Sequence, residues 1–159
     1  MKNRKIAIID EDKKILEELE EILNLSGYTP VTVIDPSLAV HTIMNNKPDI
    51  ILMELRMPRK NGFELTHTIN GVFETKKVPI IAMSESYRDE FRWLFELCGI
   101  KRWIKKPFQP LDLIWAIENE IEEGEKNVKT SSSEFSRTDQ EQGVRFSPIS
   151  LRQDALSSK

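Results

Sequence analysis

Cysteine is almost absent from this chain. The single cysteine, Cys98, excludes an internal disulfide bond and fits a reducing compartment, so we expect a cytoplasmic protein. The residues next to it are mostly apolar, which favours a small core residue over a reactive thiol.

Long apolar runs and an excess of positive charge are also missing. No stretch approaches the roughly 20 apolar residues that a membrane-spanning helix needs, so we expect no membrane span. The formal net charge of -3 offers no broad basic surface for nucleic acid. The short basic start leads directly into an apolar strand rather than a signal-peptide core, so we expect no export signal.

What the sequence does contain is a regular alternation of strands and helices. Strands are expected over 5–9, 29–34, 50–53, 78–83 and 102–105, with a helix after each, the last three over 62–72, 87–98 and 110–123. This alternation predicts an α/β fold, in which a parallel five-stranded sheet is covered by helices on both faces. We expect the doubly wound, flavodoxin-like strand order 2-1-3-4-5.

The composition changes abruptly after Gly124. Serine and glutamine replace the apolar periodicity, and Phe135 and Phe146 stand alone. We therefore expect a single domain over 1–124 and a flexible, disordered C-terminal tail over 125–159.

The segment from Pro48 to Gly62 organises the chain. Its apolar run over 50–53 is typical of a strand buried on both faces, and Glu54 stands at the carboxyl end of that strand. Ligands of open α/β sheets bind at this end, so Glu54 is placed for chemistry. A solvated strand-end acid fits this stretch equally well.

The predicted topology brings the ends of four strands to one edge of the sheet. The residues expected there are Asp10, Glu11, Glu54, Ser84 and Lys106. Three crowded carboxylates repel one another unless a cation lies among them, and their oxygen atoms suit Mg²⁺. The lysine and the hydroxyl can contact a phosphoryl group. Each residue alone is weak evidence, since Ser84 also fits a helix cap.

Together these motifs resemble the receiver domain of bacterial two-component response regulators (CheY-like). The resemblance covers about residues 3–123 and rests on the segments 8–12, 48–58, 79–84 and 106–108, with Gly62 and Gly99. It implies a CheY-like (βα)5 fold that signals in a phosphorelay and is not an enzyme. It also implies two kinds of partner: a histidine kinase or phosphotransfer protein, and a downstream protein target.

The resemblance also assigns roles to individual residues. Asp10 and Glu11 match the metal-binding acid pair, Glu54 matches the phosphoacceptor and metal ligand, and the backbone carbonyl of Arg56 matches a further ligand. We expect Mg²⁺ as the cofactor, with its binding weakened or lost by the departures described next.

The conformational switch and the phosphoryl contact are assigned in the same way. Ser84 matches the switch hydroxyl, Trp103 the aromatic switch position and Lys106 the lysine that contacts the phosphoryl group.

Two residues depart from the family pattern. Glu54 replaces the phospho-accepting aspartate, and a displacement of about 1 Å can cost on the order of a hundredfold in rate. We therefore expect phosphotransfer to be lost or very slow, with Glu54 partly imitating the phosphorylated state. Glu85 replaces a small residue and narrows access to the site, unless its side chain points into the solvent. A competent receiver that carries an engineered aspartate-to-glutamate change is the alternative.

An aromatic surface is expected on the fourth helix, fifth strand and fifth helix, a face that docks partners in receivers. Its candidate residues are Trp93, Trp103, Leu111 and Trp115. We expect a protein interface here, including a homodimer through this face. Ordinary packing over the sheet edge is the alternative.

Two other functions deserve comparison. Asp10 and Asp12 after the first strand resemble the acid pair of haloacid-dehalogenase phosphatases, but small residues usually follow that motif, whereas Lys13 and Lys14 follow here. A flavin site would need a hydroxyl- and glycine-rich phosphate loop after the first strand, which the sequence lacks.

Overall fold

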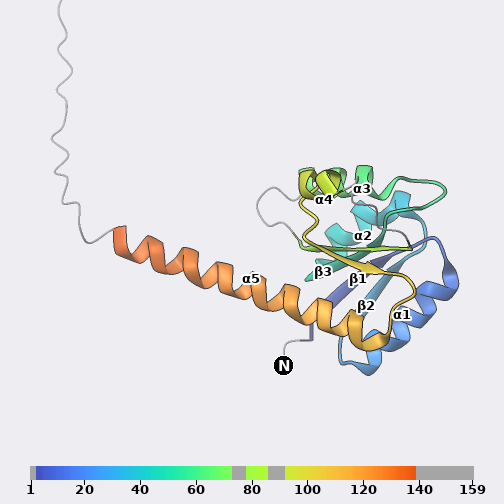
Figure 1. Cartoon of the computed structure of the whole chain (residues 1–159), viewed down its shortest axis with the longest axis horizontal. Helices are drawn as coiled ribbons and strands as arrows, with labels where there is room; N and C mark the ends of the chain where they lie inside the picture. The colour runs from blue at the N-terminus through green and yellow to red at the C-terminus, as the bar shows by residue number, and fades with distance from the viewer. Residues whose placement is uncertain (1–2, 73–77, 86–91, 139–159) are drawn as a thin grey trace, which may run out of the picture. The chain divides into compact units, whose positions relative to one another are not determined.

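The computed structural model describes residues 3–72, 78–85 and 92–138, and its sheet has the predicted topology (Figure 1). The five parallel strands lie in the order β2-β1-β3-β4-β5. They are β1 (Lys5–Ile9), β2 (Thr29–Val33), β3 (Ile50–Glu54), β4 (Ile80–Ser84) and β5 (Arg102–Lys105). The predicted α/β fold with strand order 2-1-3-4-5 is therefore confirmed.

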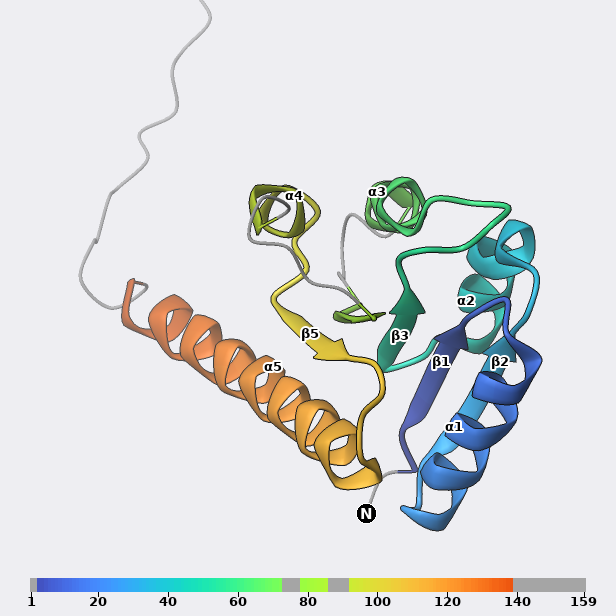
Figure 2. The ribbon, with the colours of Figure 1, turned by 45° about the vertical axis from the view of Figure 1, so that its right-hand side comes forward.

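Helices cover both faces of the sheet (Figure 2). They are α1 (Lys13–Leu25), α2 (Ala39–Asn46), preceded by the 3-10 turn η1 (Pro36–Leu38), α3 (Gly62–Val72), α4 (Arg92–Leu97) and α5 (Pro110–Thr138). One face carries α1 and the first turns of α5, and the other carries α2, α3 and α4.

Alternate residues of the central strand enter two separate cores. Ile51 and Met53 pack with α2, α3 and α4, whereas Ile50 and Leu52 pack with α1 and α5. Every residue of β3 is buried, which explains why its sequence is apolar without alternation. The strand is therefore a rigid support for Glu54 at its end.

The predicted bounds differ from the structure at several ends. Thr29–Val33 forms β2, so Ile34 lies beyond the strand, and β4 starts at Ile80 because Pro79 has no N–H to donate to a neighbouring strand. Pro36 opens a 3-10 turn capped by Asp35 rather than the helix itself. The predicted start of the fourth helix, 87–91, lies outside the described residues.

The last helix is longer than predicted. It was expected to end near Glu123, but α5 continues to Thr138, so the first part of the predicted disordered tail is helical. Gly124 costs a helix only about 1 kcal/mol, and Glu125 and Lys126 are good helix formers. Contacts divide the chain into Met1–Gly124 and Glu125–Lys159. Residues 139–159 lie outside the described part.

Within the described ranges, no helix combines the length and the apolar character that crossing a membrane requires.

Candidate functional site

The carboxyl edge of the sheet brings the predicted residues together. Asp10 follows β1, and Glu54 is the last residue of β3, in register with Met83 of β4. Ser84 ends β4 beside Lys105, and its carbonyl oxygen accepts a hydrogen bond from the backbone N–H of Lys106 at 2.9 Å. The strand register therefore places these residues at adjacent strand ends.

Lys106 joins two of the three acids. Its ammonium nitrogen lies 2.7 Å from Oδ2 of Asp10 and 2.7 Å from Oε2 of Glu54, and all three side chains are largely buried. Burial opposes the charge on the ammonium group, but hydrogen bonds to Asp10 and Glu54 outweigh it and raise the pKa of Lys106 above its ordinary value. The lysine is therefore a fixed cation at the centre of the site.

The Glu54 carboxylate is held at both oxygen atoms. Oε2 contacts Lys106, and Oε1 accepts a hydrogen bond of 2.8 Å from the backbone N–H of Arg56. The side chain therefore folds back toward the loop that follows its own strand. Asp10 is anchored similarly, because its Oδ1 accepts a hydrogen bond of 2.9 Å from the N–H of Asp12.

Glu11 has a partner that was not predicted from the sequence, Arg59. The backbone N–H of Arg59 donates to Oε2 of Glu11 at 3.0 Å, and its guanidinium forms an ion pair with Oε1. The backbone hydrogen bond, aided by the guanidinium, lowers the pKa of Glu11. The sequence feature that could have pointed to this contact is the position of Arg59, a cation directly after Pro58 in the loop that follows the strand of Glu54.

A tight loop brings Arg59 back over the site. Arg56 and Asn61 form a bridge, and the N–H of Gly62 donates to the carbonyl of Leu55 at 3.1 Å. A Cβ atom on Gly62 would lie 2.6 Å from the Cα of Leu55 and 2.8 Å from the carbonyl oxygen of Glu54. Only glycine permits this close approach of α3 to the end of β3.

The acids, as arranged, do not fit a metal ion. In the described part of the chain, no group of three or more His, Cys, Asp or Glu side chains is arranged to hold one. Lys106 contacts Asp10 and Glu54, while Arg59 contacts Glu11. A magnesium site at these residues and the carbonyl of Arg56, which the resemblance implies, therefore stays a prediction.

The remaining site residues lie around these ion pairs. Ser84 is buried at the end of β4, whereas Glu85 is exposed and lines a cavity of about 520 Å³ together with Asp10, Glu54 and Lys106. Trp103 is half-buried on β5 and packs against the core shared with α3 and α4.

The predicted interface contains three exposed apolar side chains and one half-buried one. Trp93 and Trp115 are each 62% exposed and Leu111 is 81% exposed, whereas Trp103 belongs mainly to the packing of the domain. Arg102 lies 5.7 Å from the ring centre of Trp115.

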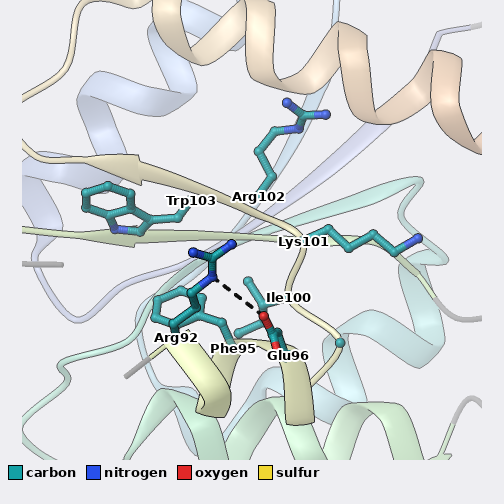
Figure 3. A pocket seen from close by; sticks show the side chains of 8 residues that line it. Arg92, Phe95, Glu96, Ile100, Lys101, Arg102 and Trp103 are labelled. Carbon is teal, nitrogen blue, oxygen red and sulfur yellow. Dashed lines mark ion pairs between the residues drawn. The ribbon is translucent and has the colours of Figure 1, made fainter. Parts of the chain in front are cut away.

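A pocket of about 630 Å³ lies between α4 and β5 (Figure 3). Phe95, Ile100 and Trp103 form its apolar wall, and Arg92 pairs with Glu96 at its rim at 3.6 Å. Arg102 turns away from α4 and pairs with Glu120 on α5 at 3.2 Å.

The fold and the sequence agree with those of known receivers. Residues 6–118 match the response regulator receiver domain family. The chain is 27% identical over 142 residues to response regulator GtcR of Aneurinibacillus migulanus, a match that covers 85% of this chain and 57% of GtcR. The chain therefore spans little more than half the length of that relative.

Solved structures show the same fold. A CheY-like receiver domain from Methanospirillum hungatei matches with a TM-score of 0.72 and 24% identity, over 78% of this chain and 98% of that one. Chemotaxis protein CheY4 of Vibrio cholerae matches with a TM-score of 0.70 and 23% identity, over 73% and 97%.

The phosphatase alternative is excluded by the family, and Asp12 has a structural role instead. Its carboxylate caps α1 by accepting hydrogen bonds from the N–H groups of Lys14 and Ile15. The chain belongs to the response regulator receiver domain family, a signalling domain of two-component systems and not an enzyme.

Proposed function

We propose that this chain is an atypical receiver, in which Glu54 replaces the phospho-accepting aspartate and the signal passes by protein docking. The observation that supports the proposal is that both oxygens of the Glu54 carboxylate accept hydrogen bonds. One oxygen contacts Lys106 at 2.7 Å and the other accepts the N–H of Arg56 at 2.8 Å.

This arrangement disfavours phosphotransfer for two reasons. A carboxylate that attacks a phosphoryl group needs an oxygen lone pair aimed at phosphorus, whereas the hydrogen bonds at both oxygens of Glu54 use two of its roughly four lone-pair positions and restrain its orientation. In addition, Lys106 already balances two carboxylates, so it is less able to stabilise charge on an incoming phosphoryl group. Exposed Glu85 at the cavity adds a further negative charge.

The domain would signal through its exposed aromatic face. Trp93 on α4, together with Leu111 and Trp115 on α5, presents a large exposed apolar side chain. Tryptophan side chains in particular contribute strongly to protein interfaces. The expected partners are a histidine kinase or phosphotransfer protein upstream and a protein target downstream, and a second copy of the chain can use the same face.

Treatment with acetyl phosphate and Mg²⁺, followed by intact mass spectrometry, tests the loss of phosphotransfer. We expect the wild type to keep its unmodified mass and Glu54→Asp to gain one phosphoryl group. Stoichiometric modification of Glu54 in the wild type would contradict the proposal. Failure of Glu54→Asp to react would show that other residues also disable the site.

A phosphorylation-competent receiver with a single altered acid is the second candidate. Ser84 and Lys106 lie at the strand ends where phosphoryl contacts are expected, which favours a site that aspartate can restore. Full recovery in Glu54→Asp would support a competent receiver that carries an engineered aspartate-to-glutamate change, whereas failure to recover would count against this candidate.

A further inference from the structure

We propose that Arg59 forms an ion pair with Glu11 that takes the place of a divalent metal ion at this residue and so keeps the ion out of this receiver. The inference deepens the proposed function and rests on it, because a receiver that transfers no phosphoryl group does not require the ion for chemistry. The acidic site would then be balanced by two side chains of the chain itself, Lys106 and Arg59.

The contacts divide the three acids between the two cations. Lys106 contacts Asp10 and Glu54, and Arg59 contacts Glu11. These three carboxylates and the two cations that contact them leave one formal negative charge among the five groups, instead of the three that unpaired acids would carry. The electrostatic attraction for a divalent ion is therefore much smaller than three unpaired acids would provide.

Arg59 also competes for the coordinating atoms themselves. Both oxygens of Glu11 are engaged, one by the backbone N–H of Arg59 and one by its guanidinium. The side chain of Glu11 is 10% exposed, whereas that of Arg59 is 62% exposed. The guanidinium therefore lies on the outer side of Glu11 and shares its carboxylate, while Glu11 still lines the cavity that contains Asp10 and Glu54.

The loop geometry fixes the backbone part of this contact. The close approach of Gly62 to Leu55 and the bridge between Arg56 and Asn61 hold the turn that carries Arg59. The backbone N–H therefore stays near Glu11 when the side chain changes. Replacing the guanidinium with an uncharged group frees one carboxylate oxygen and removes one positive charge, while the loop keeps its course.

The test is a Mg²⁺ titration of the full chain by calorimetry, with tryptophan fluorescence, to which Trp93, Trp103 and Trp115 all contribute, as a second readout. We compare the wild type with Arg59→Gln, and use Lys60→Gln as the control because it removes the same charge from the same loop. We expect Arg59→Gln to bind Mg²⁺ on the order of tenfold or more tightly than the wild type, the effect of one charge-assisted hydrogen bond. Lys60→Gln should behave like the wild type.

Equal Mg²⁺ affinity in the wild type and Arg59→Gln would overturn the inference, whether both bind or neither does. An equal gain in Lys60→Gln would also overturn it, because a general charge effect would then suffice. If Arg59→Gln does not fold, Arg59→Met replaces it, since methionine also removes both the positive charge and the guanidinium contact with Glu11. An increase in Mg²⁺ affinity is expected for that variant too, and no change would overturn the inference.

The outcome is separable from that of the proposed function. A wild type that binds Mg²⁺ as tightly as Arg59→Gln, yet is not phosphorylated by acetyl phosphate, would overturn the role of Arg59 alone. A wild type that accepts a phosphoryl group while Mg²⁺ affinity still rises in Arg59→Gln would overturn the proposed function alone.

Discussion

The ammonium nitrogen of Lys106 lies 2.7 Å from Oε2 of Glu54, and the same nitrogen lies 2.7 Å from Oδ2 of Asp10. One lysine therefore connects the ends of β1, β3 and β5. Glu54 is therefore one member of a buried group of charges that Lys106 holds together. The first two predictions concern this lysine.

Removing the lysine charge should destabilise the domain. Lys106→Met leaves the carboxylates of Asp10 and Glu54 side by side without their cation, and we expect a loss of about 2–4 kcal/mol in the free energy of unfolding. Urea denaturation measures this loss. The control is Lys105→Met, because Lys105 is exposed and its change should stay within about 0.5 kcal/mol. Equal effects of the two variants would contradict a specific role for Lys106.

The contribution of Lys106 should be insensitive to pH near neutrality. Its pKa is raised in the folded state, despite burial, by Asp10 and Glu54. Because the pKa of Lys106 is higher in the folded state than in the unfolded state, its charged form stabilises the fold. This stabilisation is fully present below the ordinary lysine pKa of about 10.4 and is lost as the pH rises through the higher pKa of the folded state. The difference in unfolding free energy between the wild type and Lys106→Met should therefore stay constant between about pH 7 and 9. A difference that fades by pH 9 would count against a stably charged lysine.

Two glycines of α3 should respond oppositely to alanine. At Gly62 a Cβ would lie 2.6 Å from the Cα of Leu55, so we expect Gly62→Ala to cost about 1–3 kcal/mol. At Gly71 nothing lies within 4 Å of an added Cβ, and Gly71→Ala should stabilise the helix by up to about 1 kcal/mol. Thermal unfolding of both variants checks the prediction. A neutral Gly62→Ala would show that the loop over the site is not held by this close approach.

The exposed tryptophans should matter for association more than for folding. Changing Trp93 and Trp115 to alanine should cost about 1 kcal/mol or less, including the contact of Arg102 with Trp115. Trp103→Ala should cost about 2–4 kcal/mol, because Trp103 packs against the core.

Sedimentation velocity over a range of concentrations tests the homodimer part of the proposal. We expect a concentration-dependent dimer for the wild type and a monomer for the Trp93→Ala, Trp115→Ala double variant. A wild type that remains monomeric at every concentration would remove a second copy as the occupant of this face.

The sequence predicted those parts of the site that depend on strand order. The apolar run before Glu54 identified a central strand, and parallel topology then required Asp10, Ser84 and Lys106 to lie at the same edge. Arg59 was not predicted, because its contact with Glu11 depends on how closely the loop turns at Gly62. That turn is a tertiary feature without a periodic signal.

The sequence predicts too early an end for α5 for a different reason. The serine-rich composition after Gly124 indicates a tail, whereas the helix-forming glutamates and lysines around Gly124 allow the helix to continue. A glycine without a following proline does not end a helix that has already formed several turns.

The most direct measurement is a crystal structure of the full chain, determined from crystals grown with millimolar Mg²⁺. Our account predicts that Lys106 remains within hydrogen-bond distance of Asp10 and Glu54, that Arg59 remains on Glu11, and that no metal ion lies among the three acids. A Mg²⁺ ion coordinated by these acids, with the Lys106 ammonium displaced from Glu54, would contradict it.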